Sequence, residues 1–188
     1  MVTTVFYTAV TANGFLADED DSLDWLFAVP GAEDAENDMG DFLATVGAFV
    51  MGAATYEWVL RHEEEQRPGM WAESYGTLPC FVMTHRTLAV PPGANVRFVQ
   101  GDVASFWPDL VEAAGDGVLW LVGGGDLVGQ FDDAGHLDQI RLSVAPAFLP
   151  AGKPLLPRRI GPERLQLESA RASGQFVEVA YRVLPAAP

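Results

Sequence analysis

One segment of the chain places three consecutive glycines between an apolar run and a helix-like pattern. It is Val118–Phe131, VLWLVGGGDLVGQF, and its glycines are Gly123, Gly124 and Gly125. Glycine at such a junction indicates either a tight turn or the close approach of another group to the backbone. A strand, a glycine turn and a helix in this order aim free backbone N–H groups and the positive end of a helix dipole outward. The group bound at such a place is most often a phosphate or pyrophosphate.

A purely structural explanation of the same glycines stays open. Asp126 follows them at the expected start of the helix, where a carboxylate can satisfy the free N–H groups as a cap. The dinucleotide-binding fingerprint G-x-G-x-x-G is also incomplete, because its third glycine position holds Val128 and Gly129 comes one residue late. Taken alone, the segment predicts a tight turn or an anion site without deciding between them.

Two further apolar stretches end in residues that suit an anion. Phe49–Trp58, FVMGAATYEW, runs into Gly52 and then into a helix pattern whose first turn holds Thr55. Phe81–Arg86, FVMTHR, ends in a hydroxyl, an imidazole and a guanidinium, all good phosphate donors. These three donors are Thr84, His85 and Arg86. Each stretch alone also fits an ordinary capped loop. Because ligands of open α/β sheets bind at the carboxyl ends of strands, three such ends together predict one shared anion site.

The charge and composition of the chain limit its partners. Its 188 residues carry a formal net charge of −15, and Lys153 is the single lysine. Nucleic acids and anionic membranes attract basic surfaces, so we expect neither as a partner. No apolar run reaches the roughly 18–20 residues of a membrane span. Cys80 is the single cysteine, which excludes an intramolecular disulfide and fits a reducing compartment, so we expect a cytoplasmic protein.

Several familiar catalytic patterns are missing. His62 and Glu63 begin like the zinc motif H-E-x-x-H, but the second histidine position holds Gln66. The hydrolase motif G-x-S-x-G does not occur, and Cys80 lacks the second cysteine of the zinc deaminase motif P-C-x-x-C. With three His and one Cys in the chain, we expect no metal site.

The pattern of apolar residues predicts strands that alternate with helices. Short apolar runs and alternating segments indicate the strands, and apolar residues at 3/4 spacing indicate the helices. The expected strands span residues 2–12, 15–17, 48–51, 80–83, 96–99, 118–122, 137–144, 164–172 and 175–184. The expected helices span 32–46, 55–61, 103–114 and 125–134, with a loop over 66–79. This order predicts an α/β domain with a mixed, mostly parallel central sheet and an antiparallel C-terminal edge.

The order of these motifs resembles the dihydrofolate reductase superfamily, and within it the RibD C-terminal type, the reductase domain of bacterial riboflavin biosynthesis. The matching segments are TAVTANGFLADEDDSLDWL, VMGAATYEW, FVMTHR and LVGGGDLVGQFDDAGHLDQIRLSVAPAFLPAGKPLL. The resemblance implies a single three-layer α/β domain over residues 1–188 and NADPH as cofactor. It also implies a reductase of a small heterocyclic or imine substrate, acting on a CH-OH or CH-NH group and similar to 5-amino-6-(5-phosphoribosylamino)uracil reductase.

The resemblance further implies the cofactor-binding residues. Ala9 and Leu16 would line the nicotinamide end, and Gly52 and Thr55 would face the pyrophosphate. The adenosine 2′-phosphate would be held by Thr84, His85 and Arg86. The pyrophosphate and the nicotinamide ribose would be cradled by Gly123, Gly124, Gly125, Asp126 and Leu127.

One departure from the family concerns the phosphate side of this site. The family usually has a basic residue after its MG, whereas this chain has Ala53 and Ala54. The loss of one charge-assisted hydrogen bond weakens affinity roughly 10–150-fold, which makes Arg86 correspondingly important.

A hydride acceptor of the C=N type also needs a proton donor. Folate reductases use a helix carboxylate with an aromatic residue one turn later, and Asp38 and Phe42 reproduce that i, i+4 pair. Asp38 is therefore our candidate catalytic residue, although it also fits a solvated residue of an acidic helix, and Asp24 is a weaker candidate. Phe42, Trp25 and Tyr56 are our candidates for substrate contact, with core packing as the alternative for Trp25 and Tyr56.

Two other functions stay open at this stage. A non-catalytic nucleotide- or ligand-binding protein of the same fold is suggested by Ala53 and Ala54, and a plain dihydrofolate reductase is the other alternative. The terminal strands and the apolar run Leu142–Leu149 suggest pairing of sheet edges, so we expect a homodimer that binds a small-molecule substrate.

Overall fold

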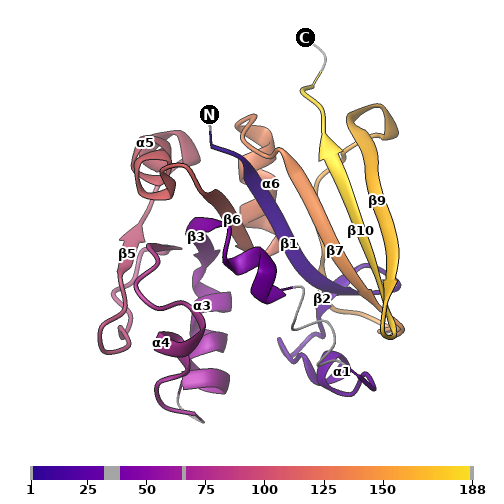
Figure 1. The fold of residues 1–188 in the computed structure, drawn as a ribbon, viewed down its shortest axis with the longest axis horizontal. Helices are drawn as coiled ribbons and strands as arrows, with labels where there is room; N and C mark the ends of the chain where they lie inside the picture. The colour runs from indigo at the N-terminus through magenta and orange to yellow at the C-terminus, as the bar shows by residue number, and fades with distance from the viewer. Residues whose placement is uncertain (1, 32–38, 65–66, 187–188) are drawn as a thin grey trace.

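The computed structural model describes residues 2–31, 39–64 and 67–186, and Figure 1 shows their arrangement. The main sheet has eight strands in the order β5-β4-β3-β6-β1-β7-β10-β9. In this order they are β5 (Val96–Val99), β4 (Cys80–Met83), β3 (Val46–Gly52), β6 (Val118–Gly123), β1 (Thr4–Thr11), β7 (Gln139–Ala145), β10 (Phe176–Val183) and β9 (Leu165–Ser173). The first six strands are parallel to one another, whereas β10 and β9 are antiparallel to their neighbours. The predicted mixed sheet with an antiparallel C-terminal edge is therefore confirmed.

Helices cover both faces of this sheet and give the fold three layers. The helices are α1 (Asp24–Phe27), α3 (Ala53–Val59) with a π-helical continuation (Leu60–Glu64), α4 (Met70–Ser74), α5 (Val103–Ala114), α6 (Gly125–Asp133) and a 3₁₀ turn (Pro162–Arg164). Residues 39–43 are also helical, and a small second sheet pairs β2 (Phe15–Ala17) with β8 (Lys153–Pro154). Among the residues that the structure describes, no helix is long and apolar enough to cross a membrane.

Alternation along the strands divides the apolar residues between two cores. In β1, Phe6 packs with residues of α5 and α6 on one face, while Val5 and Tyr7 pack with residues of α3 and α4 on the other. Successive side chains of a strand point to opposite faces, so a strand covered on both faces reads as a continuous apolar run. This is why the parallel strands were visible in the sequence as short apolar stretches.

The structure corrects the prediction at two places. The expected loop over residues 66–79 contains the helix α4, whose Trp71 is 2% exposed and packs in the core. The expected helix over 32–46 ends earlier, because residues 39–43 are helical and β3 begins at Val46. Residues 32–38 lie outside the described part of the chain.

Candidate functional site

A cleft of about 630 Å³ opens at the carboxyl ends of β1, β3 and β6. Figure 1 shows α1 and β2 beyond the carboxyl end of β1, where they form one wall of this region. The cleft brings together most of the cofactor residues predicted from the sequence. Those that line it are Ala9, Leu16, Gly52, Thr55, Gly123, Gly124, Gly125, Asp126 and Leu127.

The three glycines at the N-terminal end of α6 have three different surroundings. Gly123 has φ +147°, a backbone conformation that side chains rarely adopt, and its peptide bond to Gly124 is cis. A Cβ on Gly125 would lie 2.4 Å from the carbonyl oxygen of Leu155. The backbone at Leu155 can therefore lie this close to α6 only because residue 125 is a glycine. A Cβ on Gly124 would meet nothing within 4 Å, so no contact within the described chain requires glycine at this position.

Within the described part of the chain, no side chain caps the start of α6. Gly124 is the N-cap residue, and Asp126 makes no capping hydrogen bond to the first turn. The carboxylate of Asp126 instead accepts from Nε2 of Gln130 at 3.0 Å and pairs with Arg158 at 3.1 Å. The structural explanation of Asp126 as a cap is therefore wrong, and the first N–H groups of α6 remain for a ligand.

The second predicted segment lies directly beside these glycines. Met51 is paired with Gly123 across β3 and β6, and Gly52 is the N-cap of α3, again without a side-chain cap. The hydroxyl of Thr55 lies 3.8 Å from the place that a Cβ on Gly123 would occupy. Two glycine-led helix starts, far apart in the sequence, thus face one cleft.

The third predicted segment reaches the wall of the cleft only with its methionine. Met83 lines the cleft, but the donors that follow it in the sequence do not. The guanidinium of Arg86 forms a two-pronged ion pair with Glu57 of α3, at 3.0 and 2.6 Å. Its hydrogen bonds lower the pKa of Glu57 and raise that of Arg86. The backbone N–H of Arg86 donates to Thr84, and Nδ1 of His85 lies 3.1 Å from Oε1 of Gln100.

The predicted substrate residues are divided between different surroundings. Trp25 lines the cleft. Tyr56 is 0% exposed and donates its hydroxyl hydrogen bond to the carbonyl of Ala89 at 2.7 Å, and burial raises its pKa to about 12. Tyr56 is absent from the walls of the cleft, so this placement gives its substrate role no support. The candidate acid Asp38 lies outside the described residues and stays a prediction.

Sequence reasoning missed several apolar walls of the cleft, namely Leu23, Leu26, Trp58 and Tyr75. Trp58 had a usable signal, because it lies three residues after Thr55 on the same predicted helix and i, i+3 residues share a face. Leu23 and Leu26 flank Trp25 in a segment with no long periodicity.

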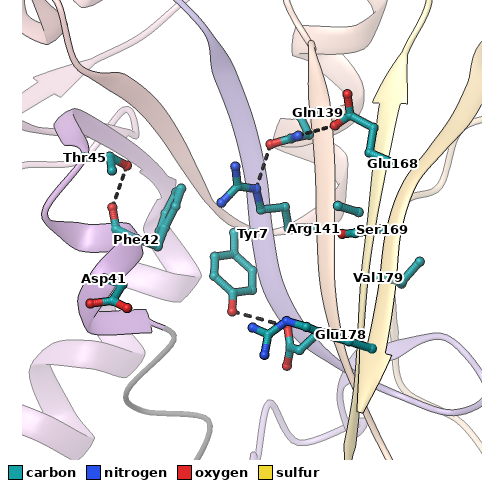
Figure 2. Close-up of a pocket in the computed structure, with 12 residues that line it drawn as sticks. Tyr7, Asp41, Phe42, Thr45, Gln139, Arg141, Glu168, Ser169, Glu178 and Val179 are labelled. Carbon is teal, nitrogen blue, oxygen red and sulfur yellow. Dashed lines mark hydrogen bonds between the residues drawn. The ribbon is translucent and has the colours of Figure 1, made fainter. Parts of the chain in front are cut away.

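A second cavity of about 460 Å³ lies on the sheet face formed by β1, β7, β10 and β9, beside the helical residues 39–43 (Figure 2). Phe42 lines this second cavity rather than the cleft, and its ring contacts the rings of Tyr7 and Trp120 at 5.0 and 5.8 Å. In Figure 2, Arg141 extends from β7 toward the helix that carries Phe42. Its Nε donates to Gln139 at 2.7 Å, and Gln139 in turn donates to Glu168.

The sheet order and the cleft at its carboxyl edge define a dihydrofolate reductase-like α/β fold. The chain belongs to the RibD C-terminal domain family, whose model matches residues 3–179. It is 30% identical over 178 residues to the uncharacterized protein YwjB of Bacillus subtilis, covering 95% of this chain and 96% of that protein.

Two solved structures have the same fold. A putative riboflavin biosynthesis protein from Shewanella sp. PV-4 superposes with a TM-score of 0.77 at 22% identity, covering 97% of this chain and 99% of that one. A diaminohydroxyphosphoribosylaminopyrimidine deaminase/5-amino-6-(5-phosphoribosylamino)uracil reductase from Thermotoga maritima superposes with a TM-score of 0.69 at 16% identity. That alignment covers 97% of this chain and 56% of the Thermotoga chain.

Proposed function

We propose that this chain is an NADPH-dependent reductase of a small heterocyclic or imine substrate. The observation that carries the proposal is the pair of uncapped, glycine-led helix starts of α3 and α6 facing one cleft at the carboxyl ends of parallel strands. Membership of the RibD C-terminal family supports a reductase rather than another user of nucleotides.

The cofactor would supply the hydride, and the residues of this chain would bind and orient it. The N–H groups at the start of α6 suit the pyrophosphate, and Thr55 can donate to a phosphate oxygen from the other side. Ala9 and Leu16 line the same cleft, which supports the prediction that they contact the nicotinamide. Apolar walls such as Leu16 and Leu26 would exclude water from the transfer.

The second candidate function is a non-catalytic binding protein of the same fold. Two observations favour it over a plain dihydrofolate reductase. Ala53 and Ala54 line the cleft where the family has a cation, and Arg86 is held by Glu57. This protein would still bind a nucleotide or heterocycle but would not oxidise NADPH with any substrate.

The deciding experiment combines binding with turnover. We expect purified protein to bind NADPH saturably, and Arg86→Ala to weaken binding roughly 10–150-fold, the range for a lost charge-assisted bond. Arg97→Ala is a matched control, since its guanidinium lies over the Phe81 ring at 5.3 Å and it is absent from the cleft walls. No binding at millimolar NADPH would refute the proposal. Binding without NADPH oxidation across pterins and aminopyrimidines would favour the second candidate, and inhibition by antifolates would favour a folate reductase.

We also propose that the chain forms a homodimer through the C-terminal edge of the sheet. β9 is the edge strand at the C-terminal side of the sheet, and Leu167 and Val177 on the β9–β10 hairpin are 57% and 51% exposed. The backbone of an exposed edge strand can pair with another chain, and in a homodimer the same edge of a second copy would supply that partner. Sedimentation should show a dimer, and only a monomer of 20.3 kDa would refute it.

A further inference from the structure

The charged side chains described in the cleft include no cation without a carboxylate partner. Among the described residues, three charged ones line the cleft: Asp21, Asp126 and Lys153. The ammonium of Lys153 lies 3.4 Å from a carboxylate oxygen of Asp21, and Asp126 is paired with Arg158 from outside the cleft. Each of these two carboxylates therefore has one cationic partner, and Lys153 has a carboxylate beside it.

No other lysine or arginine of the chain lines this cleft. The sequence has 11 Lys and Arg, and residues 1, 32–38, 65–66 and 187–188, which the structure does not describe, include none of them. All 11 are therefore placed, and Lys153 is the one that lines the cleft. Arg86, three residues after the cleft residue Met83, is paired with Glu57, and in the proposed function the N–H groups of α6 serve the cofactor.

The remaining walls are aromatic and aliphatic. Trp25 and Leu26 of α1 and Trp58 of α3 line the cleft, and the Trp58 ring stacks against those of Phe27 and His62 at 6.3 and 4.6 Å. The indole N–H groups of Trp25 and Trp58 are buried and have no hydrogen-bond partner among the described residues. Flat aromatic walls suit a planar ring, and an unpaired N–H donor suits a ligand with carbonyl or ring-nitrogen acceptors.

From these features we infer that the substrate is an uncharged planar heterocycle without a phosphate group. This differs from the phosphoribosyl substrate in the name of the Thermotoga protein. The inference rests on the proposed function for the division of the cleft between cofactor and substrate. A phosphate ester placed here would lose its hydration, and the one cation that lines the cleft, Lys153, already has a carboxylate partner in Asp21.

The test compares uridine with uridine 5′-monophosphate, which share a pyrimidine ring and differ in the phosphate. Each is titrated by ligand-observed NMR against protein saturated with NADP⁺, which fills the cofactor half without transferring hydride. We expect uridine to bind at least tenfold more tightly than the monophosphate. Trp58→Ala should weaken uridine binding at least tenfold, whereas Trp107→Phe should not, since Trp107 stacks on His136 and is absent from the cleft walls.

A second variant tests the charge argument directly. Asp21→Asn releases Lys153, so it should tighten binding of the monophosphate several-fold and leave uridine unchanged. Equal or tighter binding of the monophosphate by the unmodified protein overturns the inference, and so does binding of neither compound. Failure of NADP⁺ to bind is measured in the same samples and counts against the proposed function instead.

Discussion

The cleft and the second cavity are both hollows on one protein, but they are built from different groups. The cleft presents backbone N–H groups and apolar walls, and few of its side chains are charged. The second cavity is lined by arginines, glutamates and other polar side chains that largely bind one another, such as Arg141 to Gln139 and Gln139 to Glu168. A site with free backbone donors can accept a ligand, whereas a network whose donors have partners stabilises the sheet face.

The largest effects are expected from alanine substitutions at two glycines of the cleft, one of which should affect stability and the other NADPH binding. Gly125→Ala places a Cβ 2.4 Å from a backbone carbonyl, which cannot move as a side-chain end can, so it should destabilise the fold by about 1–3 kcal/mol. Gly124→Ala meets no atom of the described chain, so it should leave the melting temperature nearly unchanged while weakening NADPH binding at least tenfold. Thermal unfolding and NADPH titration of both variants check this. Equal stability losses would contradict the division between them.

In the second cavity, we expect a substitution to lower stability without weakening NADPH binding. Glu178 is 8% exposed and accepts hydrogen bonds from the hydroxyls of Tyr7 and Ser143. Glu178→Ala should cost about 1–3 kcal/mol of stability, because buried donors lose their acceptor. Binding of NADPH should be unaffected, as measured by titration well below the melting temperature.

The matched control for this cavity is the more exposed Glu168, which pairs with Arg182 at 2.7 Å. Partly exposed ion pairs contribute little, so Glu168→Ala should cost less than about 1 kcal/mol. If Glu178→Ala weakened NADPH binding, the two hollows would be coupled and the comparison would fail.

The same contrast explains what could be predicted from the sequence. The strands around the cleft and the helix α5 have local signals, since apolar runs and 3/4 spacing depend on neighbours in the sequence. The helix α4 has five residues, too few for an apolar repeat, so neither the helix nor the burial of Trp71 could be predicted from the sequence. Contacts between distant segments could not be predicted either. Gly125, for example, must be a glycine because the backbone of Leu155 lies against it.

The candidate site was predictable to a similar degree. Glycine turns at strand ends are local features, and Gly52 and the three glycines of residues 123–125 line the cleft, whereas the predicted donors Thr84, His85 and Arg86 do not. The aromatic candidates were less certain, because a ring one turn from a site can face either the core or the ligand. Phe42 and Tyr56 both face buried surroundings, a choice that depends on Trp120 and Ala89 from other elements.

The smallest expected effect concerns Arg86 and Glu57, 29 residues apart, which no local pattern could have joined. Like the donors of the second cavity, the guanidinium of Arg86 already has a partner within the protein. A 2′-phosphate must compete with the Glu57 carboxylate, whereas NADH lacks that phosphate and need not. Because an exposed pair is weak, Glu57→Gln should tighten NADPH binding only about threefold to fivefold and leave NADH unchanged. Parallel titrations with the two cofactors measure this, and an equal change for both would show that Arg86 does not contact the 2′-phosphate.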